Sequence, residues 1–496
     1  MENSFKGRIF GTPVLSLVAA LGLLQGAALV FWGSKGAVVT LGMWCIYALF
    51  RWPHLVLIAA LVIIFDGLGF INGDFFFRVP GVFRLKDLIF CCLFLPLLFN
   101  IKWQKRAAAI YHEYRTLLFP ILVILVLTTM QMVRTSFQYD LPLTTCIMAG
   151  REYWYYAFLP LAAIYIDDVR KRKVTYNLFL LVISVLAGII IIQTVTLWLG
   201  GKLFLTSNIQ VQLREWGILK LSRIYPPGEP ALVLGFALAF WGMVLKKESR
   251  ERIAYAVMTL ICGLSVLLVN SRMRWAHALL VVLIPVVLLW IHIPRAGRRS
   301  LVLACIPFLL FVWAFGVSDW GGHYVSGIMA RAFSGWDDFR GGKGTWGSRL
   351  EESQFRFKLI REHSLFGLGF VHPDYAWAFG GRGVVEIDED GGHFQKEGVS
   401  TQDSGIVSLL IHFGVLGVLW AIWYSISVFR LCSRMLKSPG NSRIHWVFIP
   451  LAGYMAGGLV TFVTLGLFTM ASEIVGYSFA LGMSIAGEWI QNSPRH

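Results

Sequence analysis

Residues 177–199 read NLFLLVISVLAGIIIIQTVTLWL, an apolar run of 23 residues without a charged side chain. As one α-helix, a run of this length covers the hydrocarbon layer of a bilayer, roughly 30 Å thick. Four consecutive basic residues, Arg170 to Lys173, precede it, as is typical of the cytoplasmic end of a membrane-spanning helix. This stretch predicts a membrane protein.

The composition of the whole chain agrees with this prediction. Of the 496 residues, 57% are hydrophobic and 15% are charged, whereas soluble domains are about 25% charged. The mean hydropathy is +0.66. At about 20 residues per helix, we expect an all-α polytopic membrane protein with about fourteen transmembrane helices. Single spans are expected over 84–100 and 404–429.

Basic residues set the expected orientation. The formal net charge of +16 would suit nucleic acid only if the basic residues formed a stripe on a water-exposed surface, but they lie in short clusters between apolar runs. This positive-inside pattern places both termini in the cytoplasm and makes the first span, 10–32, a retained signal anchor. We divide the chain into N-terminal transmembrane helices (1–200), an outer loop with core helices (201–317), a large extracytoplasmic loop between spans 11 and 12 (318–403) and C-terminal transmembrane helices (404–496).

Motifs for soluble enzyme chemistry are missing from the sequence. It contains neither a P-loop nor a GxGxxG that follows a strand, and the cytoplasmic loops are too short to hold an enzyme domain. The seven cysteines lie mostly within or on the cytoplasmic side of apolar runs, which predicts no disulfide framework. Any chemistry is therefore expected in the membrane or at its outer face.

Ionisable residues gather at one predicted face of the membrane. At membrane depth such residues are costly and mark candidate functional sites, although the alternative that they only mark interfacial ends stays open. Their position suggests a polar cavity that opens outward. They are Asp66, Arg84, Lys86, Asp87, Arg151, Glu152, Arg223, Glu229, Arg272, Arg274 and Glu473.

Arg223 and Glu229 border an irregular start of the span that follows them. The stretch 222–230 reads SRIYPPGEP, and its prolines oppose a regular helix. At membrane depth such backbone is tolerated only beside protein or a water-filled cavity. A guanidinium held there suits phosphate, because it forms bidentate charge-assisted hydrogen bonds. The alternative is that Pro230 is simply the first residue of a helix.

The next outer turn, Asn270–Trp275, reads NSRMRW. Arg272 and Arg274 in so tight an outer turn run against the charge bias of the short loops. Binding of an anion at the outer leaflet explains their placement, and contact with lipid headgroups is the alternative.

The long loop 318–403 combines aromatic and basic side chains, which suits stacking on sugar rings. A loop core with an interfacial aromatic belt is the alternative. Helical spacing over Ser348–Arg361 puts Arg349 and Arg356 on one face. The acidic stretch Glu386–Glu397 matches part of a calcium loop, but a solvated acidic turn is the preferred interpretation.

Four segments resemble, in the same order, motifs of the O-antigen ligase and polysaccharide polymerase superfamily of bacterial membrane proteins. They cover about residues 220–425, less than half of the chain, and the span spacing and long outer loop agree as well. The segments are Arg223-x2-Pro226 with Glu229-Pro230, Asn270-Ser271-Arg272 before Trp275, Ser348-Arg349 with the helix that ends in Ser364–Phe370, and Gln402–Gly405 with Leu409, Gly414 and Gly417.

The resemblance implies a GT-C-like glycosyltransferase at the outer membrane face that needs no metal or cofactor. Its donor would be a polyprenyl-diphosphate-linked oligosaccharide, and Arg223, Arg272 and Arg349 match the arginines that bind the diphosphate in that family. We add Arg274 and Arg356 to the substrate-binding residues because of their positions beside these arginines.

Catalysis is expected to involve Arg223, Glu229 and Asp403. Fixed arginines stabilise the departing diphosphate, and Glu229 or Asp403 would act as the base toward the acceptor hydroxyl. Ligases of the family carry a His-Asn pair where this chain has Asp403-Ser404. The resemblance therefore favours polymerisation of repeat units, as in exopolysaccharide or capsule, over ligation.

The expected location is the bacterial cytoplasmic membrane, with the bilayer and other polysaccharide-assembly proteins as partners and no nucleic acid. The main alternative function is a lipid-linked oligosaccharide flippase, since such transporters also have many helices and cationic cavities. The absence of matched halves with interrupted helices argues against it. A non-catalytic assembly scaffold is a third possibility, and it predicts tolerance of changes at Arg223.

Overall fold

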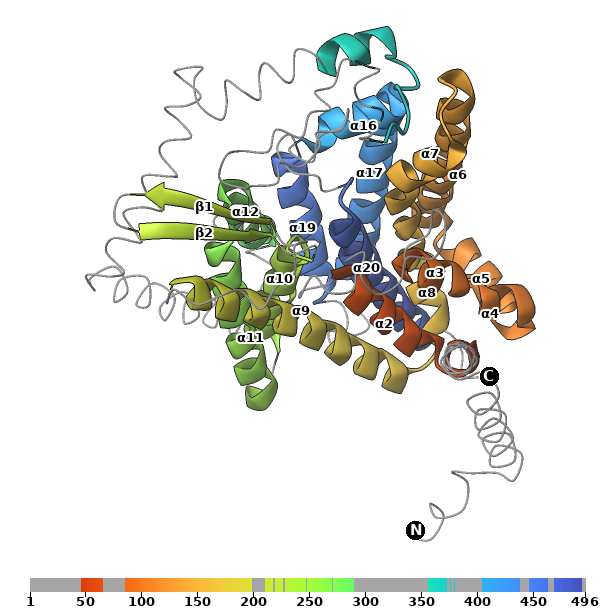
Figure 1. Cartoon of the computed structure of the whole chain (residues 1–496). Coiled ribbons are helices and arrows are strands. Elements are labelled where there is room, and N and C mark those ends of the chain that lie inside the picture. The colour runs from red at the N-terminus through yellow and green to blue at the C-terminus, as the bar shows by residue number, and fades with distance from the viewer. Residues whose placement is uncertain are drawn as a thin grey trace, which may run out of the picture.

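The computed structural model describes residues 46–65, 85–198, 210–216, 219–225, 228–246, 248–269, 271–289, 356–372, 404–437, 446–462 and 468–492, together with Tyr375 and Phe379. The predicted span 10–32, most of the predicted loop 318–403 and the acidic stretch 386–397 lie outside these residues. The described part of the chain is a bundle of helices with one β-hairpin (Figure 1).

The helices follow one another in the order of their labels in Figure 1. Their bounds are α2 Pro53–Phe65, α3 Leu85–Cys92, α4 Leu95–Phe99, α5 Ile101–Glu113, α6 Arg115–Gln138, α7 Leu143–Gly150, the 3-10 helix η1 Arg151–Ala157, α8 Phe158–Tyr165, α9 Val169–Trp198, α10 Ala231–Leu245, α11 Ser249–Leu268, α12 Arg272–Leu289, α16 Gly405–Phe413, α17 Val415–Lys437, α19 Phe448–Thr461 and α20 Ala471–Asn492.

The length and composition of the helices indicate a helical membrane protein. Among the described residues, α6, α9, α11 and α17 are long and apolar enough to cross a membrane, and a fifth span is added if the bent pair Lys86–Phe99 and Ile101–Glu113 counts as one. Helix α9 contains residues 177–198 of the apolar run 177–199. The expected total of about fourteen spans stays a prediction.

Helices α10 and α20 form the centre of the bundle. Nearly every side chain of α10, and of α20 from Ser472 to Ala486, is buried, and helices that are buried all round belong to the interior of large or membrane-embedded folds. Helix α20 packs against α8, η1, α9, α10, α19 and α2, and it lies in the middle of Figure 1.

Helix α6 shows how the outer helices divide their faces. One face is buried and carries polar side chains, among them Thr128, Gln131 and Thr135. The opposite face is apolar and exposed, an arrangement that is stable against lipid but not against water. Its exposed residues are Phe119, Leu122, Val126, Met130, Val133 and Phe137.

Two of the predicted spans are interrupted. The stretch predicted as one span over 404–429 forms α16 and α17, which are separated by Gly414. The stretch predicted over 84–100 forms α3 and α4 with a turn between them, and the chain then bends by 97° into α5. The Asn100 side chain starts α5 by accepting a hydrogen bond from the Lys102 backbone N–H at 3.0 Å, which is a typical helix cap.

The described residues are helical, as predicted, apart from one short β-hairpin. Strand β1 (Gln210–Trp216) pairs antiparallel with β2 (Leu219–Tyr225), and Gln212 lies opposite Arg223 in the register. Strand β2 contacts α9 and ends a few residues before α10. In the sequence, β2 therefore ends four residues before Glu229.

Asp167, in the connection between α8 and α9, joins two helices. Its carboxylate oxygens each lie 2.6 Å from an ammonium nitrogen, Oδ2 from Lys102 of α5 and Oδ1 from Lys171 of α9. Burial alone would raise the pKa of Asp167, but hydrogen bonds from Lys102 and Lys171 and their charges outweigh burial and lower it below its ordinary value. The pairing fixes α5 against the start of α9.

Replacement of Asp167 by asparagine should lower the free energy of unfolding by roughly 0.5–1 kcal/mol at neutral pH, because its lysine partners are partly exposed to water. Since folding lowers the pKa of Asp167, its contribution is complete above the unfolded value of about 3.9 and is lost as the pH falls through the lower folded value. Thermal unfolding of both proteins in detergent should show a constant difference down to about pH 5 that shrinks below it. A difference that grows with acidification would contradict this assignment.

Candidate functional site

Glu229, Arg274 and Glu473 form a buried cluster, which we call the charge triad, where α10, α12 and α20 begin. Arg274 Nε lies 3.2 Å from Glu229 Oε1, and Arg274 Nη1 pairs with Glu473 Oε1. All three residues are buried: Glu229 is 6% exposed, Arg274 is 3% exposed and Glu473 is 1% exposed. The structure thus brings together two of the predicted site residues, Glu229 and Arg274, and adds a third, Glu473, that the sequence placed at the same membrane face.

Local sequence explains why these three side chains meet. Glu229 precedes Pro230, the N-cap of α10, and Glu473 lies in the first turn of α20. Carboxylates are favoured there because the helix dipole leaves partial positive charge at the N-terminus. Arg274 lies in the first turn of α12, where the same dipole disfavours a cation, so the two carboxylates compensate its charge.

The charge triad carries one more negative than positive charge when both carboxylates are ionised. The second carboxylate oxygen of Glu473, Oε2, has no hydrogen-bond partner among the described residues. The remaining Arg274 contact is from Nη2 to the Met470 sulfur at 3.6 Å. Because a buried charge without a partner is costly, this surplus is a candidate functional feature.

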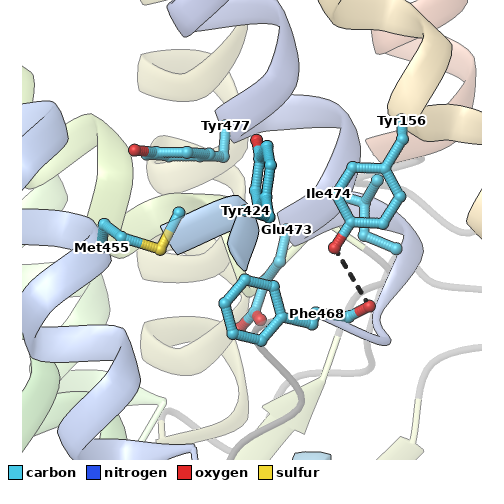
Figure 2. Close-up of a pocket in the computed structure, with 7 residues that line it drawn as sticks. All are labelled: Tyr156, Tyr424, Met455, Phe468, Glu473, Ile474 and Tyr477. Atoms are coloured by element: carbon cyan, nitrogen blue, oxygen red, sulfur yellow. Dashed lines mark hydrogen bonds between the residues drawn. The ribbon is translucent and has the colours of Figure 1, made fainter. Parts of the chain in front are cut away.

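A small cavity lies beside Glu473 (Figure 2). The cavity has a volume of about 10 Å³, close to the least that one water molecule requires. Figure 2 shows that its walls are mostly aromatic, and that the Tyr156 hydroxyl donates to the Phe468 carbonyl (3.2 Å) instead of to Glu473. The lining residues are Tyr156, Tyr424, Met455, Phe468, Glu473, Ile474 and Tyr477.

The start of α16 is joined to the same end of the bundle. Ser404 caps α16 by accepting a hydrogen bond from Val407 N at 3.4 Å, and Gly405 N donates to Phe462 O, at the end of α19, at 3.1 Å. The Phe462 ring packs against Phe468 of the cavity, with 4.9 Å between centroids. The chain therefore enters α16 at the end of the bundle where the charge triad lies. In the sequence, Asp403 directly precedes Ser404.

A second buried ion pair lies in the region of η1. Arg151 Nη1 lies 2.7 Å from Asp87 Oδ2, and the Tyr155 hydroxyl donates to Asp87 Oδ1 at 2.8 Å. Arg151, Asp87 and neighbouring Lys86 are all buried. The sequence placed these three residues at the same membrane face as the charge triad, and η1 packs against α20.

The segment Ser364–Phe370 packs against the corner between α16 and α17. Leu368 N donates to Ile411 O at 2.7 Å, and Val415 N donates to Ser364 O at 2.8 Å. From α6, Gln131 Nε2 donates to Phe366 O at 2.6 Å, and Arg134 Nη2 donates to Gly367 O. The segment therefore connects α6 to the corner between α16 and α17 by hydrogen bonds on both sides; we call this connection the clamp.

The other predicted site residues are less fully placed. Arg223 belongs to β2 and Arg272 begins α12, but their side chains lie outside the described part of the structure. Arg349 and Asp403 lie outside the described residues altogether. Arg356 is buried, 6% exposed, in a helix that covers 356–362.

No protein-family model matches the chain, and no curated protein matches it either. Among the described residues, no group of three or more His, Cys, Asp or Glu side chains is arranged to hold a metal ion. The functional assignment therefore depends on the residues themselves. The signal that could have added Glu473 to the site is an acidic residue in the first turn of an apolar helix, at the predicted face that already holds Arg274.

Proposed function

We propose that the protein polymerises polyprenyl-diphosphate-linked glycan repeat units at the outer face of the bacterial cytoplasmic membrane, by metal-independent glycosyl transfer within a GT-C-like bundle of about fourteen spans. The observation that carries the proposal is the ion pair between Glu229 and Arg274. It ties the segment that contains Arg223 to the segment that contains Arg272. Both segments belong to the family resemblance.

The contacts of the charge triad suggest different roles for the arginines. Arg274 is compensated by two carboxylates, so we assign it a positioning role: it holds Glu229 at the start of α10. Arg223, Arg272 and Arg349 are then the arginines proposed to bind the diphosphate. Ligation to a different acceptor uses the same chemistry. We rank it second because this chain has Asp403-Ser404 where ligases carry a His-Asn pair.

The reaction needs two kinds of group. The bond between the sugar and the diphosphate breaks, and arginines fixed in a pocket of low dielectric stabilise the charge that develops on the departing diphosphate. The acceptor hydroxyl forms the new glycosidic bond and loses its proton to a carboxylate, Glu229 or Asp403. Both carboxylates directly precede helices that begin at the end of the bundle where the charge triad lies.

Chain extension in proteoliposomes that contain a lipid-linked repeat unit tests the proposal. We expect extension without nucleotide and in the presence of a metal chelator. Arg223→Ala and Arg349→Ala should each slow it by about 10²–10³-fold, the usual loss when one group that stabilises transition-state charge is removed. Product length on gels provides the measurement.

Arg115→Ala is the matched control, because Arg115 is an exposed arginine at the opposite, predicted cytoplasmic end of α6. It should extend chains at the parental rate. Unchanged extension in both Arg223→Ala and Arg349→Ala would remove these arginines from the site, and absence of extension by the parent protein would favour a scaffold.

One observation favours the flippase as a second candidate. The surplus negative charge of the charge triad is buried within the helix bundle, and ionisable groups at such places are frequent in transporters. Transfer of intact lipid-linked oligosaccharide between leaflets, without formation of longer chains, would support this candidate against the polymerase.

A further inference from the structure

We infer that the charge triad binds one exchangeable proton, which the Glu473 carboxyl accepts at Oε2. The inference depends on three observations: two carboxylates share one guanidinium, all three side chains are at least nine-tenths buried, and Glu473 Oε2 has no donor among the described residues. It holds whether or not the protein transfers glycans. One proton changes the net charge of the triad from minus one to zero.

Among the described side chains packed around the triad, none supplies a second positive charge in contact with the two carboxylates. From α12, His277 Nε2 lies 3.0 Å from the Tyr454 carbonyl oxygen of α19, so this nitrogen carries the hydrogen of the contact. His277 Nδ1 has no partner among the described residues. A second hydrogen on Nδ1 would be buried without an acceptor, so the geometry favours a neutral imidazole. Arg274 is the one cation in described contact with the two carboxylates.

The neighbouring hydroxyls do not donate to Glu473 Oε2 either. The Tyr477 hydroxyl donates to Leu451 O at 3.1 Å, and the Tyr156 hydroxyl donates to Phe468 O. Figure 2 shows the hydroxyls of Tyr477 and Tyr424 directed away from the Glu473 carboxylate. The hydroxyls of Tyr424 and Tyr454 have no partner among the described residues. The aromatic side chains therefore surround the surplus charge without neutralising it.

The size of the cavity selects a proton over a metal ion. Calcium and magnesium require about six or more oxygen ligands, whereas the cavity is mostly aromatic and has space for about one water molecule. Its one carboxylate is that of Glu473. A water molecule in it could deliver a proton to Oε2 and accept a hydrogen bond from the resulting O–H. The proton comes from a hydronium ion of the solvent, which becomes water as the carboxylate becomes a carboxylic acid.

Infrared difference spectroscopy of the full chain in lipid nanodiscs tests this site, because a protonated carboxyl has a carbonyl stretch apart from those of carboxylates and amides. Between buffers at about pH 6 and about pH 9, where exposed carboxyl groups with pKa values near 4 stay ionised, the parent protein should show such a band, and its frequency should shift in heavy water. Glu473→Gln should lose the band. Glu488→Gln is the matched control at the far end of the same helix, where Tyr114 donates to the carboxylate at 2.6 Å, and it should keep the band.

Each other outcome overturns the inference. If the parent protein shows no such band, the inference is wrong. This measurement uses the parent protein alone and does not depend on whether a variant folds. A band that persists at full intensity in Glu473→Gln assigns the proton elsewhere. Removal of the band by sodium at constant pH, compared with choline, shows that the site takes a metal cation instead. Loss of chain extension alone would bear on the proposed reaction and not on this site.

Discussion

Replacing Arg274 by glutamine should lower the free energy of unfolding by about 3–5 kcal/mol, the usual cost when one partner of a buried ion pair is removed. The substitution leaves two carboxylates, Glu229 and Glu473, buried without their cation. The three helices whose starts they join, α10, α12 and α20, include both central helices of the bundle. We therefore expect a large loss of thermal stability in detergent, with a smaller yield of monodisperse protein.

Two further variants make this result specific. Lys102→Gln also removes a cation from an ion pair, but the Lys102 side chain is 63% exposed, so it should cost less than about 1 kcal/mol. The triple variant of Glu229, Arg274 and Glu473 to glutamine removes every charge of the triad and should recover at least half of the loss, since replacing a whole buried ion cluster is often nearly neutral. Equal stability of Arg274→Gln and the parent protein would show that the triad does not hold the helices together.

Sequence alone predicted which residues share a membrane face, but not which of them touch. Glu229 and Arg274 come from neighbouring predicted outer turns, and the structure pairs them. Glu473 was placed at the same face, yet its contact with Arg274 crosses 199 residues of sequence. Hydropathy and charge bias fix the depth of a residue in the membrane, whereas its neighbours depend on how helices pack side by side. That packing order is not encoded in any single span.

The hairpin shows a signal that the sequence contained and that hydropathy did not reveal. In β2, apolar Leu219 and Leu221 alternate with polar Lys220 and Ser222, the two-residue period that is typical of a strand. Long apolar runs, which predict membrane-spanning helices, do not indicate so short a strand. Arg223, which we expected to border the irregular start of α10, lies in a strand that ends shortly before it.

The break at Gly414 could not be predicted because glycine is common within membrane-spanning helices. Its meaning depends on a distant segment. Gly414 has φ of +62° and ψ of −150°, a conformation that is essentially restricted to glycine. A Cβ atom there would lie 2.4 Å from the Leu365 carbonyl oxygen. The close packing of the segment Ser364–Phe370 against the corner between α16 and α17 therefore requires glycine at position 414.

Gly414→Ala should therefore lower the free energy of unfolding by about 2–5 kcal/mol, from backbone strain and from the clash with a backbone atom that a side-chain rotation cannot relieve. Loss of the corner also loosens the clamp that holds α6 through Gln131 and Arg134. We expect a lower unfolding temperature in detergent and faster proteolysis after the 364–370 segment is released. Both are measured on the purified full chain.

Gly188→Ala is the matched control, because it adds the same methyl group within α9 where, apart from its chain neighbours and the nearby backbone of α9, no described atom lies within 4 Å of the new Cβ. Alanine favours a helix over glycine, so its stability should be unchanged or raised by up to about 1 kcal/mol. If the Gly414→Ala and Gly188→Ala proteins unfold at the same temperature, the corner tolerates a side chain and the positive φ is not required. If the Gly414→Ala protein alone is destabilised, Gly414 serves the packing of the bundle, which separates its structural role from the chemistry proposed for the arginines.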